Sequence, residues 1–321
     1  TQQDGFYFPD SLEYSRAASH LLRTGELPTG YSRAPAYPAF LAALYAVFGE
    51  AILPVRLTES FLGALLAVLL AALGKRIGGP VVGTLAGSIW AVYPMGIFIV
   101  GLVYPTNIAA LLLACGVWFI LPVQDEPVPA QRAFASGIVF GLAALAIPVA
   151  LLTVVFVAGW VFFGMPKSRA LCASLVVLGA TAAVGPWTAR NYLVHEQFLL
   201  VQPGIEAHLP RIKIPQASRT ETRLSAILRR PDLYAGHFGR NFVQFWELYP
   251  SRLKTSNQEY RDKLHAKDPR IVKETIYNSN ELINAVSLFS TGPIVIFGLV
   301  GTAAMWWRSR RREVCLLWLI T

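Results

Sequence analysis

Long apolar runs separated by short polar segments recur along most of the chain. A membrane-spanning α-helix needs about 20 predominantly apolar residues, and most of these runs approach that length. The pattern therefore predicts an all-α integral membrane protein that crosses the bilayer several times. The predicted apolar segments lie near residues 52–73, 80–101, 106–122, 133–148, 149–164, 169–186 and 286–307, and another begins at 314.

The composition supports a membrane protein. Of the 321 residues, 54% are hydrophobic and only 15% are charged, and the mean hydropathy is +0.47. A soluble domain usually has about 25% charged residues. The formal net charge is +9, which favours lipid headgroups and lipid-linked phosphates as partners over nucleic acid. The three cysteines lie within apolar segments and show neither a disulfide framework nor a metal-binding spacing.

Basic residues predict the topology. The segments at 133–148 and 149–164 are short, so they form either two thin crossings or one helix kinked at Pro148. Two crossings place Lys75–Arg76, Lys167–Arg169 and the basic run at 308–312 together in the cytoplasm, as the positive-inside rule requires. We therefore favour two crossings, which leave residues 1–51 and 187–285 outside the cytoplasm.

This topology divides the chain into four parts. The long polar segment should hold a small, mainly helical domain of its own, with helices interrupted at Pro231 and Pro269. The chain begins in a polar loop and ends inside an apolar run, so we expect further spanning helices before residue 1 and after residue 321. The parts are a first external loop with juxtamembrane helices (1–51), a transmembrane bundle (52–186), an external loop domain (187–285) and a C-terminal transmembrane part (286–321).

The first loop contains a carboxylate pair at the start of a predicted helix, in "PDSLEYSRAASHLLRTGE". Asp10 followed by Glu13 fits a capping box, in which both acids satisfy free backbone N–H groups. Gly25 can close the helix. The alternative is that one acid accepts a proton during catalysis at the membrane surface, and one carboxylate can fill both roles.

A second short helix is predicted in "YSRAPAYPAFLAALYAVFG", residues 31–49. Its apolar part is too short to span a bilayer, so we expect it to lie in the interface. Arg33 stands just before it. This arginine either extends to lipid headgroups or binds a phosphate, for which its planar guanidinium is well shaped.

Together these stretches resemble the GT-C glycosyltransferases, and in particular the bacterial group related to protein O-mannosyltransferases and the lipid A aminoarabinose transferase. The resemblance is carried by "PDSLEY", "RAPAYPAFLAALYAVFG", "VRLTES" and "GGPVVGTLAGSIWAVYPMGIFIVGLVYPTN", and by "GPWTARNYLV" at residues 185–194. It implies a GT-C-like helix bundle in a bacterial inner membrane, with surface helices in the first external loop. It also implies transfer of a sugar from a polyprenyl-phosphate carrier to an acceptor outside the membrane.

The resemblance assigns roles to individual residues. An acid in the first loop is the family's key catalytic residue, and this role falls on Asp10, with Glu13 as the second candidate. The departing lipid phosphate needs positive charge around it, which Arg33, Arg190 and Arg16 could supply. For Arg190 the alternative is an anchor in the interfacial aromatic belt.

Two departures from the family leave another function open. Relatives commonly carry an acid where this chain has Asn107, and the aminoarabinose transferase has an acid where this chain has Ser32. We therefore assign no metal or other cofactor. A non-catalytic lipid-binding or assembly subunit, working with partner subunits, is the alternative. A transporter is disfavoured because no charged residue lies mid-span: Glu59 is near the start of its helix.

Overall fold

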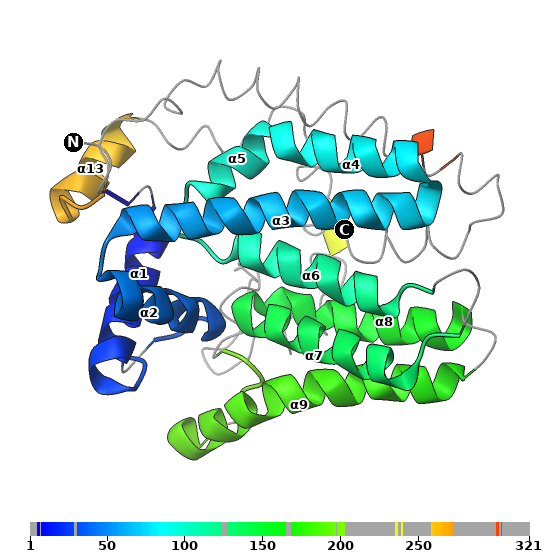
Figure 1. Cartoon of the computed structure of the whole chain (residues 1–321). Coiled ribbons are helices and arrows are strands. Elements are labelled where there is room, and N and C mark those ends of the chain that lie inside the picture. Colours follow the sequence, from blue (N-terminus) through cyan, green and yellow to red (C-terminus); the bar gives the residue numbers. More distant parts are fainter. Residues whose placement is uncertain are drawn as a thin grey trace.

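The computed structural model describes residues 5–6, 8–28, 31–122, 127–164, 168–196, 198–202, 235–236, 239, 258–271, 300–301 and 303. Within these ranges the regular structure is helical, as predicted, and the single β-bridge joins Phe6 to Ile271. The helices are α1 (Pro9–Thr24), α2 (Ala36–Phe48), α3 (Ile52–Gly78), α4 (Pro80–Val92), α5 (Pro94–Val100), α6 (Thr106–Ile120), α7 (Ala130–Ala146), the 3₁₀ turn η2 (Pro148–Ala150), α8 (Leu151–Gly164), α9 (Arg169–His195) and α13 (Gln258–Lys267) (Figure 1).

Two helices, α3 and α9, are long and apolar enough to cross a membrane. The α4–α5 pair passes the same test together, although its two helices meet at an angle of 56°. The apolar segment predicted near 80–101 thus forms two helices, because Pro94 cannot continue the backbone hydrogen-bond ladder of α4. The helices α2, α6, α7 and α8 are apolar but shorter.

The chain turns back on itself at Pro148. Helix α7 ends at Ala146, and α8 begins only after the 3₁₀ turn. The thiol of Cys172, near the start of α9, lies 3.6 Å from the carbonyl oxygen of Val128, which directly precedes α7. Since α8 runs into α9 through a short connection, the start of α7 and the end of α8 lie at the same end of the bundle. This excludes a single kinked helix over 133–164.

Other boundaries differ from the sequence-based ones. Helix α9 continues through Pro186 to His195, past the predicted boundary at 186. Helix α13 ends before Pro269, as predicted. The predicted interruption at Pro231 and the apolar segments at 286–307 and 314 lie outside the described residues, apart from residues 300–301 and 303.

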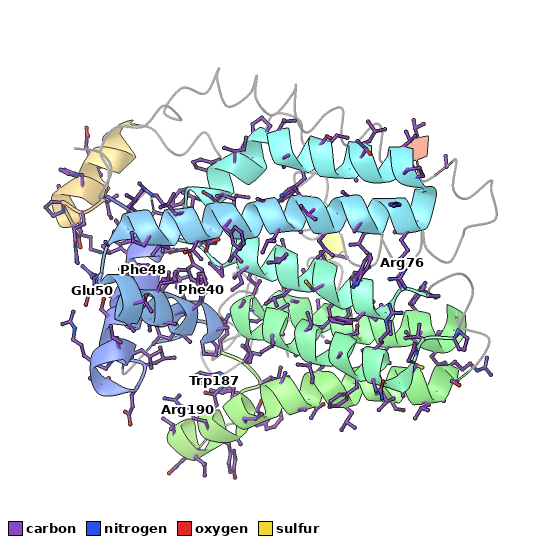
Figure 2. All side chains as sticks on the ribbon, viewed as in Figure 1. Phe40, Phe48, Glu50, Arg76, Trp187 and Arg190 are labelled. Atoms are coloured by element: carbon purple, nitrogen blue, oxygen red, sulfur yellow. The ribbon has the colours of Figure 1, made fainter. Side chains whose placement is uncertain are left out.

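The two short helices of the first loop lie side by side at one end of the bundle (Figure 1). Phe40 and Phe48 of α2 are at this end, together with Trp187 and Arg190 of α9 (Figure 2). Arg76 is at the opposite end of α3 (Figure 2). The bundle therefore separates the first-loop residues from the basic residues that end α3.

Glycines bring helix backbones into direct contact. A Cβ on Gly137 of α7 would lie 2.1 Å from the carbonyl oxygen of Val176 on α9. A Cβ on Gly179 of α9 would lie 2.2 Å from the carbonyl oxygen of Phe134. Only residues without a side chain permit this approach, which is a common way for membrane helices to associate. The α7–α9 contact is the tightest element of the core that the described ranges contain.

This packing predicts different effects for two glycine-to-alanine changes. Gly137→Ala should force α7 away from α9 and destabilise the protein by roughly 1–3 kcal/mol. Gly159→Ala in α8 meets no atom within 4 Å, so it should be neutral or stabilise by about 0.5–1 kcal/mol. Thermal unfolding of the two purified variants in detergent measures the difference. Equal stability of the two variants would contradict the described α7–α9 contact.

Candidate functional site

The first helix begins differently from the prediction. Helix α1 starts at Pro9, its N-cap residue is Phe8, and no side chain caps it. Proline suits this position because its fixed φ angle is already helical and it has no N–H group to satisfy. The predicted capping box of Asp10 and Glu13 is therefore wrong, and both carboxylates are directed to other partners. Gly25 closes the helix in the left-handed conformation, as predicted.

Arg33 brings the two acids together. Its Nη2 donates to Oδ1 of Asp10 at 2.8 Å, and its Nε donates to Oε2 of Glu13 at 2.9 Å. The acids lie one turn apart on α1, while the arginine comes from the loop before α2. The side chains are 29% exposed for Arg33, 39% for Asp10 and 45% for Glu13. The three charges thus lie at the surface, within reach of a ligand.

The guanidinium of Arg33 stays charged and keeps donor capacity. Partial burial opposes its charge, but the hydrogen bond to Glu13 and the charges of both acids raise its pKa overall. Its plane lies over the ring of Tyr14, 5.3 Å from the ring centre, which is a favourable cation–π distance. Its hydrogen bonds to the two acids use Nε and Nη2 and leave Nη1 out.

Tyr104, between α5 and α6, completes this group of residues. Its hydroxyl donates to Oδ2 of Asp10 at 3.2 Å. Burial, followed by the charge of Asp10, raises the pKa of Tyr104 to about 12, so the phenol remains a donor at neutral pH. Asp10 is therefore held at both oxygens by residues from two other elements. We call Asp10, Glu13, Tyr14, Arg33 and Tyr104 the Asp10 cluster.

A buried polar network that the sequence analysis did not predict lies next to this cluster, on the other side of the contact between Tyr14 and Tyr37. The fully buried Glu59 of α3 accepts a hydrogen bond from the hydroxyl of Tyr37 at 3.0 Å. It also accepts one from Nδ2 of Asn107 at 2.9 Å. The available signal was an acid inside an apolar run, which we interpreted as lying near the helix start.

Asn107, where the family resemblance led us to expect an acid, has a structural partner here. Its Nδ2 also donates to the backbone oxygen of Glu59 at 2.8 Å. An acid at this position could donate neither hydrogen bond in its ionised form and would place a second negative charge beside Glu59. Asparagine is therefore the residue type that the buried carboxylate requires.

Arg190 lies on α9, at the same end of the bundle as α2 (Figure 2). Its guanidinium is stacked on the ring of Trp187 at 4.9 Å, and the indole N–H of Trp187 donates to the carbonyl oxygen of Val201 at 2.6 Å. Asn191 donates to the carbonyl oxygens of Leu199 and Val201. The described residues contain no ion-pair partner for Arg190, and no described contact joins it to Arg33.

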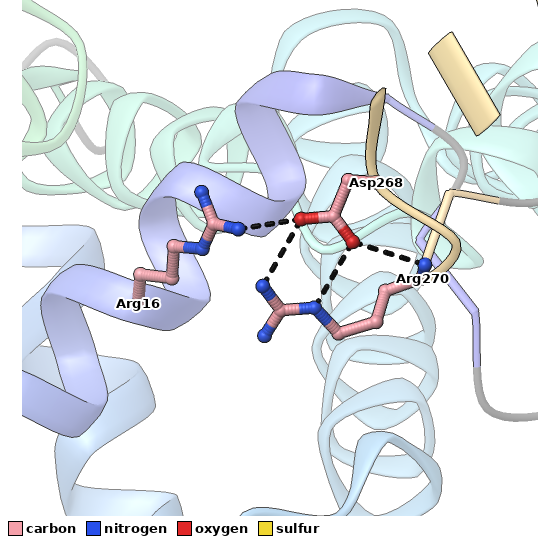
Figure 3. A network of polar contacts seen from close by, with 3 residues as sticks. All are labelled: Arg16, Asp268 and Arg270. Carbon is pink, nitrogen blue, oxygen red and sulfur yellow. Dashed lines mark hydrogen bonds and ion pairs between the residues drawn. The ribbon is translucent and has the colours of Figure 1, made fainter. Parts of the chain in front are cut away.

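Arg16 has a different partner from the one proposed for it. Its Nη2 forms an ion pair of 2.5 Å with Asp268, which also accepts hydrogen bonds from the side chain and backbone of Arg270 (Figure 3). These hydrogen bonds lower the pKa of Asp268 to about 2. A backbone hydrogen bond of 2.8 Å from Phe6 to Arg270 adds to the contact. Arg16 thus attaches α1 to the segment after α13, apart from the Asp10 cluster.

Ser32 is exposed. Across the ranges that the structure describes, no group of three or more His, Cys, Asp or Glu side chains is arranged to hold a metal ion. Comparison with protein-family models, with curated proteins and with solved structures found no match. In the residues that the structure describes, the fold and the site define an α-helical protein with two or three helices able to cross a membrane by length and composition, and an acid–arginine cluster at its first two helices.

The Asp268 contact generates a prediction for Asp268→Asn. Removing the charge that Arg16 and Arg270 share should release α13, so amide exchange in 258–267 should accelerate roughly two- to tenfold, given the modest value of exposed ion pairs. Glu50→Gln is the matched control, because it removes the exposed Arg23–Glu50 pair at 2.8 Å. It should leave exchange in α13 unchanged.

The same contact has a defined pH dependence. The pKa of Asp268 in the folded protein is below the ordinary value of about 3.9. The stabilisation that the ionised Asp268 side chain gives to this contact is therefore present above about pH 4, and it is lost as the pH falls through about 2. Protection factors of α13 should be constant from pH 7 to about pH 4. A loss of protection already near pH 6 would contradict the assignment to Asp268.

Proposed function

We propose that this protein is a glycosyltransferase of the bacterial inner membrane. It transfers a sugar from a polyprenyl-phosphate carrier to an acceptor on the outer face. The observation that carries this proposal is the pairing of Arg33 with Asp10 and Glu13, which sets two carboxylates and a cation side by side. A base for an acceptor hydroxyl and a cation for a departing phosphate are the two groups that this reaction needs.

Asp10 is the base in this proposal. The acceptor oxygen attacks the anomeric carbon of the sugar, and its proton passes to a carboxylate oxygen of Asp10. The bond from the anomeric carbon to the phosphate oxygen breaks, and the prenyl phosphate leaves with that electron pair. Tyr104 and Arg33 orient Asp10. Glu13 contacts only Arg33 among the described residues, which makes it the second candidate.

Arg33 and Arg190 bind the phosphate in this proposal. Nη1 of Arg33 can contact a phosphate oxygen while the other two nitrogens keep their acids. The guanidinium of Arg190 lies over the ring of Trp187, and its planar group of donors suits a phosphate. Ala34, next to Arg33, belongs to the same buried cluster as Val184 of α9, which supports a shared role for the two helix ends. Arg16, engaged with Asp268, is the weakest of the three candidates.

The proposed topology is a multi-spanning GT-C-like bundle. In it, α3, the α4–α5 pair, α6, α7, α8 and α9 each cross the membrane, and residues 1–51 and 187–285 are outside. The reversal of the chain at Pro148 supports two crossings by α7 and α8. Prenyl-phosphate donors and membrane lipids are then the partners at the outer face, and the acceptor stays open.

Cysteine labelling tests this topology in a variant that lacks the three native cysteines. Glu26→Cys and Glu196→Cys introduce exposed thiols in the first loop and after α9. Both should react with a membrane-impermeant reagent from outside the cell. Gln131→Cys, exposed at the start of α7, should react only after the membrane is opened. Labelling of residues 26 and 196 from opposite sides would contradict the six crossings.

The alternative is a non-catalytic lipid-binding or assembly subunit. One observation favours it: Arg33 forms ion pairs with both acids of the first loop, which also suits a purely structural role. The two functions differ in what they require of Asp10. A base needs an ionised oxygen, whereas a structural partner of Arg33 needs only a hydrogen-bond acceptor.

Asp10→Asn separates the two functions. The amide oxygen can still accept a hydrogen bond from Arg33, but it cannot take a proton from a hydroxyl. Sugar transfer should fall by roughly 10²–10⁴-fold, with little change in thermal stability. Glu13→Gln is the matched control and should keep most of the transfer. The measurement is transfer from a prenyl-phosphate donor by the purified full-length protein.

Sugar transfer by the Asp10→Asn variant at the rate of the parent protein would show that Asp10 is not the base. Absence of transfer by the parent with every donor tried would favour the assembly subunit.

A further inference from the structure

A buried carboxylate next to the Asp10 cluster joins three helices. Glu59 of α3 is 0% exposed, Tyr37 of α2 is 0% exposed and Asn107 of α6 is 2% exposed. The described hydrogen bonds of these side chains are to one another, at 2.8 to 3.0 Å. The network therefore ties α2, and with it the first loop, to the spanning part of the bundle.

The ring of Tyr37 extends this network to the Asp10 cluster. It meets the ring of Tyr14 edge to face, with centres 5.2 Å apart and planes at 85°. Tyr14 in turn meets Tyr104 edge to face at 5.7 Å and 88°. Arg33 lies over the same Tyr14 ring at 5.3 Å. Tyr14 thus contacts both residues that bind Asp10, and it also contacts Tyr37.

The carboxylate of Glu59 constrains the directions of the side chains that donate to it. An apolar side chain of similar volume avoids the desolvation cost of a buried acid and is often the more stable choice. A carboxylate, however, accepts hydrogen bonds only from donors in defined directions. Tyr37 must therefore direct its hydroxyl to Glu59, which fixes the direction of the long axis of the Tyr37 side chain. Burial, and then the charge of Glu59, raises the pKa of Tyr37 well above its usual value, so the hydroxyl remains a donor.

We propose that Glu59 is a positioning residue for the Asp10 cluster. Through Tyr37 it holds the ring of Tyr14, and that ring supports Arg33 and Tyr104 at Asp10. The effect of Glu59 on catalysis rests on the proposed function, glycosyl transfer. Glu59 has no described contact with Asp10, Glu13 or Arg33, so its effect on the reaction is transmitted by the aromatic rings.

Tyr37→Phe tests this role because it removes one hydroxyl and keeps the ring. Tyr45→Phe is the matched control. Tyr45 is also a buried tyrosine of α2, but its hydroxyl bonds to Ser15 at 2.9 Å rather than to Glu59. We expect Tyr37→Phe to lower kcat on the order of tenfold, because a small misalignment of the residues around Asp10 slows the reaction. Tyr45→Phe should leave kcat within about twofold of the parent.

A double-mutant cycle tests the positioning without any transfer reaction. Tyr37→Phe and Arg33→Gln should be non-additive in thermal unfolding, with a coupling equivalent to roughly two- to tenfold in the unfolding equilibrium. Tyr45→Phe and Arg33→Gln should be additive. If the parent transfers no sugar, the proposed reaction is wrong, and this cycle alone decides whether Glu59 and Tyr37 position Arg33.

Two changes at Glu59 complete the test. Glu59→Gln keeps an acceptor for Tyr37 and should keep the Tyr37–Arg33 coupling. Glu59→Leu removes the acceptor and should abolish that coupling. The inference is overturned if Tyr37→Phe matches Tyr45→Phe in kcat, or if its cycle with Arg33→Gln is additive. It is also overturned if the Tyr37–Arg33 coupling is the same in the Glu59→Leu background as in the Glu59→Gln background.

Discussion

The hydrogen bonding of the buried Glu59 carboxylate is the constraint on which the candidate site depends. A buried acid is tolerated only when donors satisfy its oxygens, and here the donors come from α2 and α6. This requirement fixes the position of α2, a helix too short to span the membrane by itself. Because α2 packs on α1, the same requirement sets the position of the helix that carries Asp10 and Glu13.

The two ends of the bundle have different chemistry. At one end, Arg33 joins the two acids of α1 through its Nη2 and Nε atoms. At the other end, Arg76 donates to the carbonyl oxygens of Trp118, Leu121 and Pro122, where α6 ends, and stacks on Trp118. Those arginine donors are used within the protein. The end with the Asp10 cluster is therefore the end at which we propose that the phosphate of the donor binds.

The sequence allowed the helical elements to be predicted because hydrophobic segment length and proline positions are local properties. The short helix after Pro35, the closure of α1 at Gly25 and the end of α13 before Pro269 agree with the structure. The capping box was wrong because a capping pattern describes only local hydrogen bonds. Arg33 lies 20 residues beyond Glu13, and its charge attracts the acids more strongly than backbone N–H groups do.

Membrane-compatible composition and α-helical class could be determined from the sequence by itself, and Asp10, Glu13 and Arg33 could be selected as candidate site residues. Residue type and spacing are enough for these conclusions, since a carboxylate pair and an arginine in one short loop already limit the possible chemistry. Which acid Arg33 contacts through which nitrogen, the partner of Arg16 and the Glu59 network were decided only by tertiary structure. Each of these joins side chains from helices distant in the chain, and their hydrogen bonds depend on distances and directions that no local pattern encodes.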